Sequence, residues 1–213
     1  QLAFLHLAAE GGSSELEKAL KVDVNWMTIV SARGRNALSY AAMADNLKNC
    51  MLLVKKGASW FTPDNGGAIP MHWAVQGGAI KVIKHLLTSV PKDPTGTSVF
   101  LIKDNEGVTP MHIAAKRSSA KILKMFVDAV DGEDIYTLAR DNKDRSPLHY
   151  AAGSASVECV QLILDEDKLG LPVDQKDCYQ LTPLMTAAGI ELPQCERSKI
   201  KDQSSKIKST LQR

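Results

Sequence analysis

Histidines recur at one position of a short sequence motif, and histidine is a common general base and metal ligand in proteins. Two copies of the motif read IPMHWAV from Ile69 and TPMHIAA from Thr109. The four histidines are His6, His72, His112 and His149. A metal site would need them to converge, but each lies in a separate copy of the motif. One helical turn instead places each ring near the residue three positions earlier, so we predict structural hydrogen bonds to that residue and to the adjoining loop.

The cysteines and carboxylates form no catalytic or metal-binding pattern. The cysteines are Cys50, Cys159, Cys178 and Cys195, they lie far apart, and no C-x-x-C occurs. The sequence also lacks the motifs of nucleotide-binding loops, serine hydrolases and zinc proteases. One arrangement stays open, a thiol–imidazole pair between Cys178 and His149 on neighbouring copies of the motif. We therefore predict that the chain is not an enzyme and has no catalytic, cofactor-binding or metal-binding residues.

The composition is that of a globular protein with an aliphatic core. The 213 residues are 44% apolar and only 5% aromatic, and the formal net charge is +2. This balance does not favour a nucleic-acid partner, no apolar run has the length of a membrane span, and no secretory signal is visible. We expect a cytoplasmic protein that does not insert into membranes, and the first residues read as part of a longer chain.

The motif sets the organisation of the whole chain. It occurs six times, beginning at Ala3, Asn36, Ile69, Thr109, Ser146 and Thr182. Successive copies begin 33, 33, 40, 37 and 36 residues apart, so one period of 33 with three insertions describes them all. Threonine or serine at the first position can cap a helix, and the proline that follows suits the first helical position. Each copy therefore predicts the start of a short helix.

A second amphipathic helix follows each motif except the last, because apolar residues recur there at three- and four-residue spacing. In the fifth copy the predicted apolar face is Val157, Val160, Ile163 and Leu164. Polar segments such as PDNGGA and KDNEGV join one helix pair to the next and predict turns. The units lie near 1–31, 32–64, 65–104, 105–141, 142–177 and, as a partial unit, 178–189.

Two segments depart from the period. The insertion PKDPTGTSVF, residues 91–100, is rich in proline, glycine and threonine and predicts a loop that protrudes between the third and fourth units. Residues 190–213 form a divergent tail, whose last 19 residues hold six basic and two acidic side chains. Apolar residues in the tail fall at helical spacing, so it reads as a capping helix, a divergent last unit or an appended peptide.

T-P-L-H-x-A at a period of 33 is the signature of ankyrin repeats, and the chain resembles that family over residues 1–189. The resemblance implies an all-α ankyrin-repeat solenoid of about six helix-turn-helix units joined by turn-rich fingers. It also implies a concave groove, formed by the fingers and the first helices, that binds a protein segment. The predicted groove residues are Arg33, Arg35, Tyr40, Met43, Trp73, Gln76, Asn105, Glu106, Lys116, Arg117, Asn142, Lys143, Arg145, Tyr150 and Tyr179. Basic residues predominate among them, so we expect an acidic or phosphorylated partner segment; scattered solubilising charges are the alternative.

Several stretches resemble the early ankyrin repeats of the inversin family more closely. GRNALSYAAMADNLKNCMLLVKKGA, KDNEGVTPMHIAAKRSSAKILKMFV, GEDIYTLARDNKDRSPLHYAA and LGLPVDQKD occur in that order. This resemblance implies a non-enzymatic ciliary scaffold that binds NIMA-related kinases or other ankyrin proteins. The alternatives are the cytosolic ankyrin domain of a channel or receptor, and a substrate-recruiting or regulatory domain of a larger enzyme.

Overall fold

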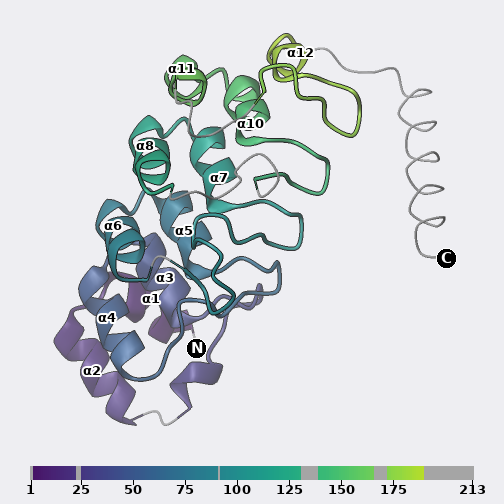
Figure 1. Cartoon of the computed structure of the whole chain (residues 1–213). Helices are drawn as coiled ribbons and strands as arrows, with labels where there is room; N and C mark the ends of the chain where they lie inside the picture. Colours follow the sequence, from purple (N-terminus) through teal and green to yellow (C-terminus); the bar gives the residue numbers. More distant parts are fainter. Residues whose placement is uncertain (1, 23–24, 91, 131–138, 166–171, 190–213) are drawn as a thin grey trace, which may run out of the picture.

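The fold is a single stack of helix pairs, as the computed structural model shows for residues 2–22, 25–90, 92–130, 139–165 and 172–189 (Figure 1). The inner helices, which face the fingers, are α1 (Leu2–Glu10), α3 (Ala37–Met43), α5 (Pro70–Gly77), α7 (Pro110–Lys116), α10 (Pro147–Gly153) and α12 (Pro183–Ala187). The outer helices are α2 (Ser13–Val22), α4 (Leu47–Lys55), α6 (Ile80–Ser89), α8 (Ala120–Asp128) and α11 (Val157–Asp165). A short 3₁₀ helix, η1, spans Trp26–Thr28, and no β-strand occurs in these ranges. The predicted all-α repeat architecture is confirmed.

From α3 onward, the inner helices begin where the motif predicts. The Thr109 hydroxyl and the Asn36 amide oxygen accept hydrogen bonds from backbone N–H groups three residues on, the second at 2.9 Å. Prolines open α5, α7, α10 and α12, where a missing N–H leaves no helical hydrogen bond unmade. Each inner helix packs on the inner helices before and after it, and alanines such as Ala74, Ala114 and Ala151 are fully buried between them.

The outer helices bury one aliphatic stripe each. In α6 the buried residues are Val82, Ile83 and Leu86. In α11 the predicted face is wrong in part, because Val157 and Leu164 are exposed, Val157 at 73%, whereas Ile163 and the unpredicted Cys159 are buried. Two residues correspond to about 200° around a helix, so Val157 projects away from the side on which Cys159 meets the core.

The insertion between the third and fourth repeats does not simply protrude, which corrects the prediction. Residues 92–98 form a tight turn closed by an isolated bridge between Lys92 and Ser98. The two residues that follow are core, since Val99 and Phe100 are fully buried. The Phe100 ring stacks on Phe126 of α8 with 5.4 Å between centroids. The end of the insertion therefore packs against the outer helix of the fourth repeat through the Phe100 side chain.

The fingers are five-residue turns at 31–35, 64–68, 104–108, 141–145 and 177–181, and they project on the side away from the outer helices (Figure 1). In four of them the first residue is aspartate, whose Oδ1 accepts the N–H groups two and four residues on; for Asp104 both distances are 2.9 Å. The fourth residue has positive φ, which glycine supplies in three fingers and Asp144 and Gln180 in the last two. One local hydrogen-bond pattern thus builds four fingers, and in the first finger Ser31 replaces the aspartate and accepts from the N–H four residues on.

Candidate protein-binding groove

The fingers are joined to one another by backbone hydrogen bonds. The N–H of Asn105 donates to the Gly66 carbonyl and that of Asn142 to the Glu106 carbonyl, both at 2.9 Å. The Asn105 and Asn142 amides also donate to the backbone of the preceding finger, at 3.1 and 2.9 Å. Because each finger fixes the next, the row of fingers forms one rigid wall beside the inner helices.

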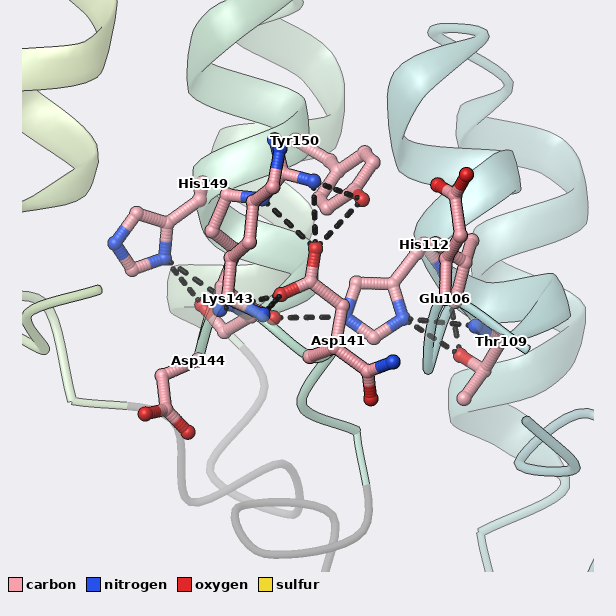
Figure 2. Close-up of polar contacts among 12 residues, drawn as sticks. Glu106, Thr109, His112, Asp141, Lys143, Asp144, His149 and Tyr150 are labelled. Carbon is pink, nitrogen blue, oxygen red and sulfur yellow. Dashed lines mark hydrogen bonds and ion pairs between the residues drawn. The ribbon is translucent and has the colours of Figure 1, made fainter. Parts of the chain in front are cut away.

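The buried histidines connect three of the inner helices, α5, α7 and α10, to the finger that follows each of them. His112 Nδ1 lies 3.1 Å from the Thr109 N–H and 2.9 Å from its hydroxyl, and Nε2 lies 3.0 Å from the Arg145 carbonyl (Figure 2). His72 and His149 repeat this arrangement, reaching the carbonyls of Val108 and Leu181 at 3.1 Å. The predicted structural role of these three rings is confirmed.

His6 is the exception among the motif histidines. It is exposed, and the residue three positions earlier, Ala3, already lies inside α1. Because Ala3 is not an N-cap residue, the His6 ring lacks the cap N–H that the other three rings contact. The prediction of a structural hydrogen bond is wrong for His6.

Finger carboxylates hold the aromatic side chains that face the fingers. Asp64 Oδ2 accepts a hydrogen bond from Trp73 Nε1 at 3.0 Å. Two repeats later, at the same position of the motif, Tyr150 donates a hydrogen bond from its hydroxyl to Asp141 Oδ2 at 2.9 Å (Figure 2). In both cases the aromatic residue follows the aspartate by nine positions. The second carboxylate oxygen thereby fixes the ring at the boundary between finger and helix.

Arg145 completes a compact ionic cluster in the fifth repeat. Its Nε donates to Asp141 Oδ2 at 2.8 Å, one terminal nitrogen donates to the Tyr150 hydroxyl at 2.8 Å, and the guanidinium lies 4.7 Å from the Tyr150 ring centroid. Burial opposes the charged form of Asp141, but the hydrogen bonds from Arg145, the backbone and Tyr150 outweigh it and lower the Asp141 pKa. The charge of Arg145 is therefore neutralised within the chain.

Arg35 occupies the same finger position in the second repeat, with a different environment. Its guanidinium lies 5.0 Å from the Tyr40 ring and 4.3 Å from the Trp73 ring, so aromatic groups of two repeats flank it. The finger residue that matches Asp141 is Ser31, which carries no charge. Arg35 forms no ion pair with the described residues, and its buried Nε has no hydrogen-bond partner there.

A groove of about 710 Å³ opens beside this cluster and spans the second to fourth repeats. Trp73, Ile113 and Gln76 line it from the inner helices, and Arg33, Asp104 and Glu106 line it from the fingers. We call this surface the central groove. It combines half-buried apolar side chains with charges of both signs. Protein–protein interfaces combine an apolar centre and a polar rim in the same way.

The predicted groove residues fall into three groups. Arg33, Trp73, Gln76, Asn105 and Glu106 line the central groove, and beside it the Arg35 guanidinium contacts the rings of Tyr40 and Trp73. Asn142, Arg145, Tyr150 and Tyr179 belong to the last two fingers or to the Asp141 cluster. Met43, Lys116 and Arg117 lie at the carboxyl ends of α3 and α7, and Lys143 is exposed in the fifth repeat. The structure thus divides the predicted set between the central groove and surfaces beside it.

Sequence reasoning missed the part that the finger carboxylates play in the groove. Asp64 and Asp104 both line it, as do Ala68 and His72. A signal was present, because Asp64 precedes Trp73 and Asp141 precedes Tyr150 by the same nine residues. Comparing that spacing between repeats would have linked each carboxylate to its aromatic partner.

The open thiol–imidazole pair does not assemble. Both nitrogens of His149 are engaged, Nδ1 with Ser146 and Nε2 with Leu181. Burial, followed by Asp177 and Asp144, raises the pKa of the Cys178 thiol, which keeps it protonated. Within the described ranges no three histidine, cysteine or acidic residues gather as a metal site would require. Nor does that part of the chain contain a helix long and apolar enough to cross a bilayer.

Stacked helix pairs with a rigid row of fingers and an open groove define a helical repeat solenoid. Comparison with protein families specifies which one: the model described as "Ankyrin repeats (3 copies)" matches residues 5–98 and 95–177. The chain therefore belongs to the ankyrin-repeat family, and its fold is the predicted ankyrin-repeat solenoid. Ankyrin repeats form protein–protein interaction domains and are typically non-catalytic. No curated protein matches the chain.

Proposed function

We propose that this chain is a non-enzymatic binding module whose central groove holds an extended segment of a partner protein. The observation that carries the proposal is the row of half-buried side chains Tyr40, Trp73 and Ile113, one from each of three successive repeats. Aromatic side chains are favoured anchors of protein interfaces, and this chain has few of them.

Rigidity of the groove supports the same function. Trp73 is fixed by Asp64, and the fingers on either side are joined through Asn105. A preformed surface loses little conformational entropy when it binds, so more of the contact energy appears as affinity. An extended segment fits the groove because the side chains that line it recur from one repeat to the next.

The resemblance to the inversin family supports a more specific role. On this proposal the chain works in the cytoplasm, at the base of a cilium, and its partners are NIMA-related kinases or other ankyrin proteins. The support is the ordered set of stretches that includes GRNALSYAAMADNLKNCMLLVKKGA and LGLPVDQKD. Co-precipitation of a purified NIMA-related kinase with this chain tests that role separately from the groove.

The groove is tested by matched variants in affinity capture followed by peptide competition. Trp73→Ala removes the central side chain of the groove, whereas Met51→Ala removes a side chain that is 43% exposed on α4. We expect partners that are captured by the wild type and by Met51→Ala but lost with Trp73→Ala, while circular dichroism shows all three chains folded. A synthetic peptide from the cross-linked segment of such a partner should then compete with the whole partner. Equal capture by all three chains would overturn the proposal.

A further inference from the structure

Two charged side chains at the central groove, Arg35 beside it and Asp104 in its lining, lack the partners that their counterparts in other repeats have. At corresponding positions of the fifth repeat, Arg145 is paired with Asp141 and Tyr150 uses the same carboxylate. The second repeat keeps the arginine but has Ser31 where the carboxylate would be. Arg35 is therefore a cation that no described residue neutralises, and its buried Nε has no hydrogen-bond partner among them.

In the fourth repeat the group without a partner is a carboxylate, that of Asp104. Asp104 Oδ1 is used by the finger backbone, as in the other fingers. The position nine residues on, which is Trp73 or Tyr150 in other repeats, is Ile113 and has no donor. Asp104 Oδ2 therefore accepts no hydrogen bond from the described residues, although Asp64 and Asp141 each use the same oxygen.

One of these two groups lies beside the central groove and the other lines it, in repeats on either side of Trp73. Arg35 stacks on Trp73, which lines the groove in the third repeat, and Asp104 lines it in the fourth beside Glu106. Packed helices lie about 8–10 Å apart, and an extended chain advances about 3.4 Å per residue. Two repeats are therefore spanned by about five or six residues of an extended segment.

We propose that the central groove recognises an extended protein segment with a carboxylate side chain bound by Arg35 and a basic side chain bound by Asp104, about five or six residues apart. This inference rests on the proposed function. An apolar or planar side chain between the two charges packs on Trp73. A single guanidinium between two rings matches one carboxylate, and Asp64, Asp104 and Glu106 in the same groove disfavour the double charge of a phosphate.

The test uses the whole chain and random 12-residue peptides displayed on phage, followed by fluorescence anisotropy with labelled synthetic peptides. We expect the selected peptides to share an acidic and a basic residue five or six positions apart. Replacing that acidic residue by its amide should weaken binding about tenfold or more in the wild type and have little further effect in Arg35→Met. Replacing the basic residue by glutamine should likewise weaken binding to the wild type and have little further effect on binding to Asp104→Asn. The asparagine retains the oxygen that accepts the two backbone N–H groups of the finger.

Two surface variants serve as charge-matched controls. Lys143→Ser removes a cation outside the central groove and Asp174→Asn removes an exposed anion, and neither should change the affinity of the selected peptides. Peptides that need Trp73 but show no charge pattern, or whose charges do not couple to Arg35 and Asp104, would overturn the inference and leave the proposed function standing. Tighter binding of a phosphoserine peptide than of its glutamate version would also overturn it. If no selected peptide lost affinity with Trp73→Ala, the proposed function itself would fail.

Discussion

The three buried histidines keep their hydrogen bonds only as neutral rings. Nδ1 of each ring accepts from the cap residue and Nε2 donates to the next finger. A proton on Nδ1 would turn that acceptor into a donor facing another donor. Burial is the main cause that lowers the pKa of all three, and for His112 the pKa falls to about 4. These rings therefore make the stability of the stack depend on pH.

The sign of that dependence follows from the pKa of His112. Since its folded pKa of about 4 lies below the unfolded value of 6.5, the native state binds fewer protons, and stability is full above pH 6.5 and is lost as the pH falls toward 4. This ring alone should remove about 2 kcal/mol of unfolding free energy between pH 7 and pH 5. Urea titrations at both pH values should show the loss in the wild type and a smaller loss in His112→Gln. Replacement of the exposed His6 by glutamine is the control, and equal pH dependence in all three chains would contradict the prediction.

The same substitution should destabilise the fold at one of the two arginines of this finger position and have little effect at the other. Arg145→Met removes hydrogen bonds from a buried carboxylate, since the Asp141 side chain is only 1% exposed, and should destabilise the fold by about 2 kcal/mol. Arg35→Met loses its contacts with two aromatic rings but also removes an unsatisfied buried nitrogen, so the two effects offset to within about 1 kcal/mol. Denaturant unfolding of both variants measures the difference. A loss of unfolding free energy in Arg35→Met as large as that in Arg145→Met would contradict the prediction.

At the scale of the helices, close approach of neighbouring repeats limits which side chains fit. A Cβ on Gly77, the last residue of α5, would overlap the backbone carbonyl of Met43 in α3. Gly153 ends α10 at a similar point, yet a Cβ there would meet only a methyl group of Thr186 at 3.3 Å. Gly77→Ala should therefore destabilise the fold by about 1–3 kcal/mol, while Gly153→Ala stays within about 1 kcal/mol of the wild type. Thermal unfolding of the two variants distinguishes them, and equal effects would show that α5 can move away from α3.

The sequence predicted the elements well because their signals are local. The cap residue, the proline and the histidine of each motif lie within four positions, and the structure uses them together at Thr109, Pro110 and His112. The missed features depend on contacts between repeats. Phe100 was assigned to a loop from the residues around it, but its burial is decided by Phe126, which is 26 positions away. The open charges at Arg35 and Asp104 likewise emerge only when one repeat is compared with another in the folded stack.

At the scale of the whole molecule, the stack holds together through contacts between neighbours. The inner helices contact one another in order along the chain, from α1 with α3 to α10 with α12. No contacts of comparable extent join the ends of the described part of the chain. Stability in such an array is a sum of terms for each repeat and for each interface. A local defect should therefore spread only to the adjacent repeats.

Hydrogen exchange can measure how far such a defect spreads. Leu123→Ala opens a cavity in α8, where the side chain is fully buried, and should weaken the fourth repeat by about 2–5 kcal/mol. Amide exchange followed by mass spectrometry should accelerate most in α7 and α8, less in α5, α6, α10 and α11, and least in α1 and α2. Val22→Ala, at a position that is 84% exposed, should leave the pattern unchanged. Uniform acceleration along the whole chain would mean that the stack unfolds as one cooperative unit. In that case a peptide bound in the central groove would protect every helix equally, whereas nearest-neighbour coupling confines the protection to the repeats around Trp73.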